Sequence, residues 1–442
     1  MKPTEMYKKV LTAFNKQNIR YCVLRNYEFL LNPKAPIGFD FDVTIQKEDI
    51  PKADAIFKKL GFIKYPSQFS RKHQGYGIYI PSAKRRIGFD IQNNGIYWND
   101  MPYLPAKQII PRRIKKKFFY VVSDEDAFIM YLCHSILGKR YFKEKYKSLL
   151  IALSKKKLDK EYIEKTLAKI FTKTIATNLL KGVYIKKFKE IEKRFYSLIA
   201  VFILKHPRNW FTFKLLSLRW FFTPKYCPLR KIPLFRYIIP GKSPMISFIG
   251  PDGSGKTTTA SALTKLLQEN NRPASLVYAG RGKAQILPIS KVGKAYKKVE
   301  EKKLQKPSFL KTIIYTTAAK IYTVDLLIRY LIKIHPKRKS EKIAVTDRYA
   351  SDILLMPNVP LVLKKFLLVL FPKPTLTFYL YNTPETLAKR SRHSIEDLNS
   401  QLSLFPILQK KFNAIEIKTQ DKKKDFDKIA QSSFNKLMQI GY

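Results

Sequence analysis

The chain has 442 residues, of which 45% are hydrophobic, and its 85 lysines and arginines against 33 acidic residues give a formal net charge of +52. This length exceeds one hydrophobic core and predicts two or three domains, and the apolar fraction excludes wholesale disorder. The three scattered cysteines indicate neither a disulfide framework nor a metal-ligand pair, which predicts a cytoplasmic protein. No apolar run reaches the roughly 18 residues that cross a bilayer.

The excess of positive charge favours anionic ligands, namely nucleic acid, anionic lipid or phosphorylated substrates. The charges are spread along the chain, so a solvated lysine-rich surface explains them equally well. Nucleic acid ranks last among these partners, because no basic motif interleaved with aromatic residues matches a known reader. Charge alone leaves the ligand class open.

Residues 1–123 alternate short strands and helices, and we expect an α+β domain. "RYCVLRN" (20–26) and "FDFDVTI" (39–45) are typical of strands, "KADAIFKKLGF" (52–62) of an amphipathic helix, and residues 75–92 of a hairpin with a basic turn. Residues 124–194 follow a helical pattern and form a predicted helical extension. His134 in this extension is more typical of helix packing than of a catalytic base.

Residues 195–244 mix tryptophan and phenylalanine with basic residues and repeated prolines, and we expect a linker between two domains. Basic segments with aromatic side chains can lie on an anionic membrane surface, which would make the protein peripheral to the membrane. The alternative is a linker whose aromatic side chains pack against both domains.

Residues 245–442 alternate strands and helices, which predicts a doubly wound parallel sheet covered on both faces. We expect strands at "MISFIG" (245–250), "ASLVYAG" (274–280), "KIAVTD" (342–347), "TLTFYLY" (375–381) and "NAIEIKT" (413–419).

Residues 250–257 read G-P-D-G-S-G-K-T, which matches the phosphate-binding pattern G-x-x-x-x-G-K-[ST] between a strand and a helix. Backbone N–H groups of such a loop surround phosphate oxygens at the positive end of the helix. Lys256 would reach the β- and γ-phosphates of ATP, and Thr257 would hold Mg²⁺. The predicted nucleotide-binding residues are Gly250, Asp252, Gly253, Ser254, Gly255, Lys256, Thr257 and Thr258.

Further candidates lie at the ends of two later strands. Asp347 ends the strand at 342–347, where open α/β sheets place their ligands, and can bind the Mg²⁺ hydration shell. The adjacent Arg348 can grip an acceptor phosphate through its two N–H groups. After the strand at 375–381 we expect a helix that carries Arg390 and Arg392, which could close as a lid on the charge developing in the transition state.

Together, G-P-D-G-S-G-K-T, the D-R-Y at 347–349 and the strand–T-P-E–helix–R-x-R lid resemble the thymidylate kinase family of P-loop kinases over residues 245–442. The resemblance implies that Asp252 faces the sugar of the acceptor nucleotide, and that Arg281 and Arg348 hold its phosphate. The chain departs from the family at Asp352, where the family usually has serine, and at the "ILLM" that follows. These positions shape the nucleoside pocket, so the identity of the acceptor stays open.

Asp40 and Asp42 lie two residues apart on one predicted strand face, and Asp90 lies on another strand. Three such carboxylates can hold two Mg²⁺ ions for nucleotidyl transfer. The pattern resembles divergent members of the nucleotidyltransferase superfamily found beside polysaccharide genes. In that family a Gly-Ser turn precedes the acids, whereas Arg25 and Asn26 stand here. An inactive or binding-only domain is therefore an equal alternative.

These patterns together predict an enzyme that transfers the γ-phosphoryl group of ATP, with Mg²⁺, to a nucleoside monophosphate resembling dTMP. Two alternatives remain. One is a kinase or nucleotidyltransferase that acts on a sugar or glycan intermediate of surface polysaccharide synthesis, and the other is a nucleic-acid-associated P-loop protein. A small nucleotide or phosphorylated substrate is the expected partner, and a homodimer is also considered.

Overall fold

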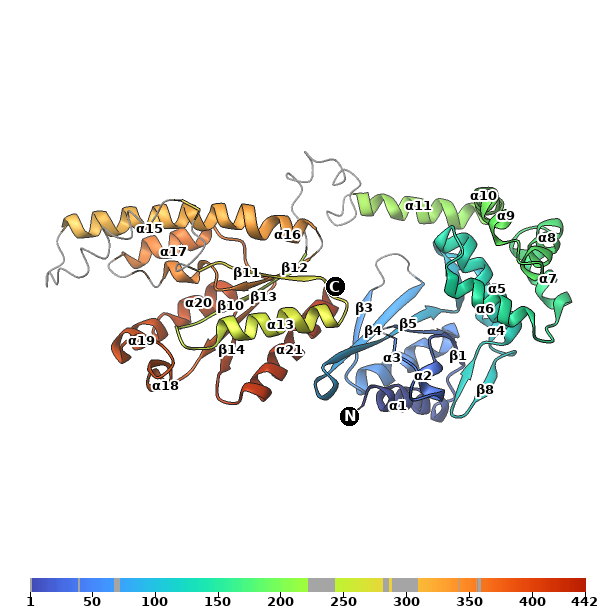
Figure 1. The fold of residues 1–442 in the computed structure, drawn as a ribbon, viewed down its shortest axis with the longest axis horizontal. Coiled ribbons are helices and arrows are strands. Elements are labelled where there is room, and N and C mark those ends of the chain that lie inside the picture. Colours follow the sequence, from blue (N-terminus) through green and yellow to red (C-terminus); the bar gives the residue numbers. More distant parts are fainter. Residues whose placement is uncertain are drawn as a thin grey trace. The chain divides into compact units, whose positions relative to one another are not determined.

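The computed structural model describes residues 2–38, 40–66, 72–221, 243–280, 286–287, 309–340, 342–354, 356 and 359–442. The chain divides into two compact units. The first comprises Met1–Arg219 with Met438–Gly441, and the second comprises Trp220–Leu437 with Tyr442. Each unit is an α/β structure with its own sheet (Figure 1).

The first unit contains a seven-stranded sheet in the order β3-β4-β5-β2-β1-β9-β8 and a separate hairpin, β6-β7. The predicted hairpin is present, because β4 and β5 pair antiparallel from His73↔Gln92 to Ile80↔Arg85. The strands are β1 (Tyr21–Arg25), β2 (Asp40–Ile45), β3 (Ile63–Pro66), β4 (His73–Ile80), β5 (Arg85–Asn93), β6 (Gly95–Trp98), β7 (Met101–Pro105), β8 (Ile114–Lys116) and β9 (Phe119–Val121).

Alternating side chains of β1 divide this unit into two cores, as a strand period of two requires. Tyr21 and Val23 belong to the core beneath α1 and α3. Cys22 and Leu24 belong to a second core, which is built mainly by helices α5 to α10. The helices are α1 (Pro3–Lys16), α2 (Glu28–Leu31), α3 (Ile50–Lys59), α4 (Ala106–Ile109), α5 (Asp124–Cys133), α6 (Glu144–Ser154), α7 (Lys160–Ile170), α8 (Lys173–Tyr184), α9 (Phe188–Lys193), α10 (Phe195–Leu204) and α11 (Pro207–Phe221).

The region expected to be a linker from residue 195 onward differs from that expectation. Residues 195–221 form helices α10 and α11. The side chains of Phe195, Leu198 and Phe202 are buried in the helical core of the first unit. Because one apolar face of α10 packs into that core, the helix extends the first unit rather than connecting two domains. Residues 222–242 of the expected linker lie outside the described residues.

The second unit has the predicted parallel sheet, in the order β11-β12-β10-β13-β14, and every neighbouring pair is parallel. The central strands β10 and β12 are buried along their whole length, as expected of strands covered on both faces. The strands are β10 (Met245–Ile249), β11 (Ala274–Tyr278), β12 (Ile343–Asp347), β13 (Leu376–Tyr381) and β14 (Ile415–Lys418).

Helices cover both faces of this sheet. Figure 1 shows α15 and α17 on one side and α13 and α21 on the other. A π-helical turn, η5 (Tyr330–Ile334), continues α15 directly into α16. The helices are α13 (Lys256–Glu269), α15 (Phe309–Arg329), α16 (His335–Lys339), α17 (Leu361–Val369), α18 (Pro384–Ala388), α19 (Ile395–Leu402), α20 (Phe405–Phe412) and α21 (Lys422–Gln439).

Within the described ranges, no helix combines the length and the apolar character that a membrane crossing requires.

Candidate active site

The phosphate-binding loop connects β10 to α13, as the motif predicts. Gly250 has φ +143°, and a Cβ there would lie 2.0 Å from the carbonyl oxygen of Leu380 on β13. Gly253 has φ +83°, and a Cβ there would lie 2.8 Å from the carbonyl oxygen of Leu387 in α18. Both positions therefore need glycine for backbone conformation and for space. The loop fits closely between its own strand and the elements that follow β13.

Lys256 is the first residue of α13, and its side chain is folded back over the loop. Only 5% of Lys256 is exposed. Its ammonium group donates a hydrogen bond to the carbonyl oxygen of Pro251 at 2.6 Å and lies 3.7 Å from Asp252 Oδ1. Burial, together with the nearby charge of Arg348, lowers the pKa of Lys256 to about 8. The ammonium is thus held at the loop among groups that only partly compensate its charge.

Thr257, in the first turn of α13, meets Asp347 at the end of β12. The register pairs Phe248 of β10 with Asp347 of β12, and Thr257 Oγ1 donates a hydrogen bond to Asp347 Oδ2 at 2.7 Å. Asp347 is 2% exposed, and its other oxygen, Oδ1, has no hydrogen-bond partner among the described residues. A hydroxyl oxygen beside a buried carboxylate oxygen without a partner fits the hard oxygen ligands that Mg²⁺ prefers.

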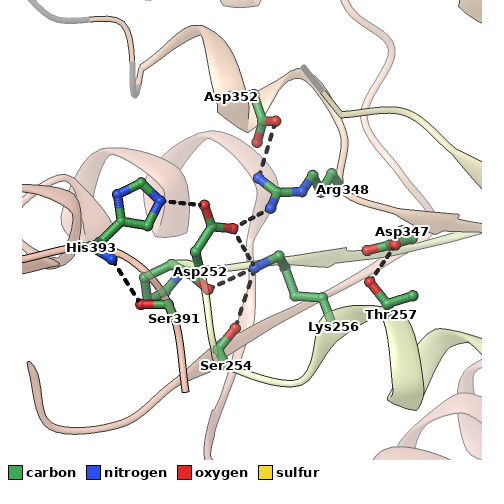
Figure 2. Close-up of polar contacts among 10 residues, drawn as sticks. Asp252, Ser254, Lys256, Thr257, Asp347, Arg348, Asp352, Ser391 and His393 are labelled. Carbon is green, nitrogen blue, oxygen red and sulfur yellow. Dashed lines mark hydrogen bonds and ion pairs between the residues drawn. The ribbon is translucent and has the colours of Figure 1, made fainter. Parts of the chain in front are cut away.

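Arg348 continues from Asp347 in a left-handed conformation, with φ +66°. Its backbone N–H donates to the carbonyl oxygen of Phe248 at 2.9 Å. Its guanidinium forms an ion pair with Asp252 and lies 3.4 Å from Asp352 Oδ2 (Figure 2). Burial opposes the guanidinium charge, but Asp352 and Asp252 outweigh it and raise the pKa of Arg348. The turn therefore directs a permanently charged group toward the phosphate-binding loop.

Asp252 is the point on which the cations of this site converge (Figure 2). Besides Arg348 and Lys256, it accepts a hydrogen bond from His393, whose Nε2 lies 2.9 Å from Asp252 Oδ2. Burial disfavours the carboxylate, but the charges of Arg348 and Lys256 outweigh it and lower the pKa of Asp252. The carboxylate therefore stays ionised between them.

The predicted lid differs in detail from the expectation. Helix α18 ends at Ala388, so Arg390 and Arg392 lie in the exposed turn before α19 rather than on a helix. The Asn382–Thr383–Pro384 sequence begins α18 with a threonine cap, and the helix lasts only five residues. A Cβ at Gly253 would lie 3.3 Å from Arg390 Cβ, so the turn begins beside the phosphate-binding loop. Within the described chain neither arginine forms an ion pair.

The remaining predicted residues have mixed outcomes. Ser254 is buried, and its hydroxyl lies 3.5 Å from the Lys256 ammonium. Gly255 precedes the helix with φ +86°, and Thr258 is exposed on its first turn. Arg281 lies outside the described residues.

Two features of the second unit have no signal in the sequence. His393 follows the lid turn, and no motif links a histidine there to an acid of the phosphate-binding loop. Asp325 and Arg329 form a fully buried ion pair on α15, and Arg329 also donates to the carbonyl oxygen of Gly280 at 2.6 Å. Charges four residues apart on a helix usually indicate a solvated face, which is why this pair was missed.

The acids of the first unit are brought together by strand pairing. Asp42 of β2 lies opposite Asp90 of β5, and Asp40 lies opposite Gly88. Asp40 and Asp42 share one face of β2 because they are two residues apart. The side chain of Asp40 lies outside the described residues.

The two described carboxylates of the expected metal site pair with basic side chains, and the three-acid metal site stays a prediction. Asp42 is 3% exposed and accepts hydrogen bonds from Arg25 at 2.8 and 3.2 Å and from Asn26 at 3.0 Å. Asp90 Oδ1 lies 3.5 Å from His73 Nδ1. Among the described side chains no group of three metal-ligating residues is gathered. The two residues that replace the Gly-Ser turn thus occupy the carboxylate that was expected to bind metal.

Comparison with known proteins addresses the second unit. Residues 248–425 match the family model for thymidylate kinase. These residues form a thymidylate kinase-like P-loop domain. Among solved structures, the crystal structure of thymidylate kinase from Ehrlichia chaffeensis is similar, with 20% sequence identity, 44% of this chain and 99% of that chain covered, and a TM-score of 0.29. No curated protein matches the chain.

The match supports a phosphotransferase of the nucleotide-kinase type in the second unit. Its matched region contains the phosphate-binding loop, the Asp347–Arg348 turn and the lid turn. The nucleotidyltransferase resemblance of the first unit stays a prediction.

Proposed function

We propose that the thymidylate kinase-like domain transfers the γ-phosphoryl group of ATP to the phosphate of a nucleoside monophosphate that resembles dTMP. The observation that carries this proposal is the position of Arg348. Its guanidinium lies beside the phosphate-binding loop and pairs with Asp252, the loop acid that the family resemblance places next to the acceptor. One side of the loop can thus hold the donor, and the other side the acceptor.

The ATP-binding part of the site, around the phosphate-binding loop, acts through positioning and electrostatics, as phosphoryl transfer requires. Backbone N–H groups of the loop and the Lys256 ammonium would bind the β- and γ-phosphates. In this role Lys256 exchanges its hydrogen bond with the Pro251 carbonyl oxygen for phosphate oxygens. Thr257 and Asp347 would hold Mg²⁺, which neutralises charge on the phosphates when bound.

The acceptor side depends on Arg348. A guanidinium binds a phosphate through two parallel hydrogen bonds, and the buried Asp352 carboxylate restrains it from the other side. An oxygen of the acceptor phosphate attacks the γ-phosphorus, the bond to the β,γ-bridging oxygen breaks, and ADP leaves with that electron pair. Arg390 and Arg392 would gather the negative charge of the transferring group once their turn closes.

Asp352 bears on the identity of the acceptor. The related kinases usually carry serine at this position, whereas this chain places a carboxylate 3.4 Å from Arg348. The added negative charge competes with the acceptor phosphate for the guanidinium. We therefore propose an acceptor whose base or sugar makes contacts other than those of thymidine, with dTMP as the reference compound.

The test is an assay of phosphoryl transfer from ATP to a panel of nucleoside monophosphates, including dTMP. Transfer should depend on Mg²⁺, and Lys256→Ala should lower it roughly 100-fold or more, because one preorganised donor to the transferring group is lost. Lys265→Ala is the matched control, since Lys265 lies on the same helix with 80% of its side chain exposed. Equal activity in the Lys256→Ala protein and the wild type would refute the proposal.

A further inference from the structure

The first unit contains a cavity of about 280 Å³ at the paired acids. Its walls include Asp42 and Asp90 from the sheet and His134 and Tyr146 from the helical extension. Arg25 also lines it, and its guanidinium is fixed by Asp42 on one side and by the Tyr146 hydroxyl at 3.3 Å on the other. Sheet and helical extension of one unit therefore build the cavity jointly.

Two of the described acids of the cavity, Asp42 and Asp90, already have a basic partner. Asp42 pairs with Arg25 at 2.8 Å. Asp90 faces His73, and although burial disfavours the imidazolium, the hydrogen bond and charge of Asp90 raise the pKa of His73. A divalent cation would have to displace these partners before it reached either carboxylate.

The cavity also contains lysines whose charges are not balanced by ion pairs. Lys139, Lys143 and Lys145 line it together with Glu28, and none of the three lysines forms an ion pair within the described parts of the chain. Three ammonium groups thus face one further carboxylate. The electrostatic character of the cavity favours an anion.

The part of the cavity formed by the helical extension is shaped by an irregular helical turn. Helix α5 passes at His134 into a π-helical turn, η3 (His134–Lys139), a feature that often marks functional sites. The His134 ring packs edge-on against Tyr146, and a Cβ at Gly138 would lie 3.2 Å from His134 Nδ1. Burial, with the nearby charge of Arg25, lowers the pKa of His134 to about 3. The imidazole is therefore neutral, and the lysines supply the charge.

We propose that this cavity binds the phosphate group of a small phosphorylated molecule directly through Lys139, Lys143 and Lys145, without a divalent cation. Its volume is just below the usual range for ligand sites, which suits a sugar phosphate or a diphosphate group rather than a large cofactor. The first unit is then a recognition module for a phosphorylated compound, separate from the kinase site of the second unit.

The test is calorimetric titration of pyrophosphate into the full chain carrying Lys256→Ala, which weakens the phosphate-binding loop, in buffer with EDTA. Binding should persist, and Lys139→Ala or Lys143→Ala should each weaken it about tenfold, because a charge-assisted hydrogen bond is lost. Lys157→Ala is the matched control, since Lys157 is an exposed lysine of the same unit that does not line the cavity. Lys143→Gln, which keeps most of the side-chain stem, separates loss of charge from loss of packing.

Two results would overturn the proposal. If pyrophosphate bound only after Mg²⁺ replaced EDTA, the acids would be metal ligands and the first unit would operate as a metal-dependent site. If Lys157→Ala weakened binding as much as Lys143→Ala, the net charge of the protein would account for the affinity. Because the kinase assay depends on Lys256 and this titration does not, the two proposals fail independently.

Discussion

At the scale of single residues, the site is dominated by buried and half-buried charges that lie close together. Lys256, Asp252 and Arg348 lie within one hydrogen-bonded group (Figure 2). In the free protein none of them is fully compensated by one partner, because Asp252 is shared by two cations and by His393. A polyphosphate would supply the missing negative charge for Lys256, and an acceptor phosphate would do so for Arg348. We therefore regard the group as arranged for anionic ligands rather than for stability.

The lowered pKa of Lys256, about 8, predicts pH-dependent nucleotide binding. Only the ammonium form stabilises phosphate oxygens, so ATP affinity should be constant below pH 8 and should fall by about tenfold per pH unit above it. Because this pKa is below the ordinary value, burying the charge opposes folding below pH 8, and that cost should disappear as pH rises toward 10.5.

Calorimetry of ATP binding from pH 6.5 to 9.5 measures this effect. Lys256→Arg is the control, because arginine keeps its charge throughout that range. An affinity that is flat across pH 8 in the wild type would contradict the predicted ionisation of Lys256.

At the scale of elements, the phosphate-binding loop and α18 are in close contact. Gly253→Ala should displace α18 and the lid turn, because its Cβ would lie 2.8 Å from the Leu387 carbonyl oxygen. Gly255→Ala is the matched control, since its φ of +86° is similar but its Cβ would meet nothing within 4 Å. We expect Gly253→Ala to lower the free energy of unfolding by about 1–3 kcal/mol more than Gly255→Ala. Equal losses in denaturant titrations would contradict the contact.

The elements also show which features a sequence pattern can predict. The loop, Asp347 and the parallel sheet followed from local patterns, since a strand–loop–helix motif and the carboxyl end of a strand define positions in space. Helix α10 could not be predicted in this way, because its apolar residues lie among the aromatic and basic residues of a segment with the composition of a linker. Helix α18 begins at a threonine cap, Thr383, and approaches the phosphate-binding loop at Gly253. Contacts of this kind lie far apart in the sequence and leave no periodic pattern.

At the scale of the whole molecule, two units with different chemistry share one chain. The second unit has a recognisable motif and a family match, and its site residues converge as the motif requires. In the first unit the strand register of Asp42 and Asp90 agrees with the sequence prediction. However, these acids pair with Arg25 and His73. Sequence spacing placed the acids on neighbouring strands. It could not show that Arg25 and His73, each 17 positions before its acid, would pair with them.

The central claim is that the phosphate-binding loop holds the donor while Arg348 holds the acceptor. The most direct measurement is a crystal structure of the protein with a non-hydrolysable ATP analogue, Mg²⁺ and dTMP. We predict that Lys256 Nζ leaves the Pro251 carbonyl oxygen for the β- and γ-phosphates and that Arg348 contacts the acceptor phosphate. A structure in which the triphosphate lies away from residues 250–257, or in which Arg348 stays on Asp252 while the acceptor phosphate binds elsewhere, would contradict the account.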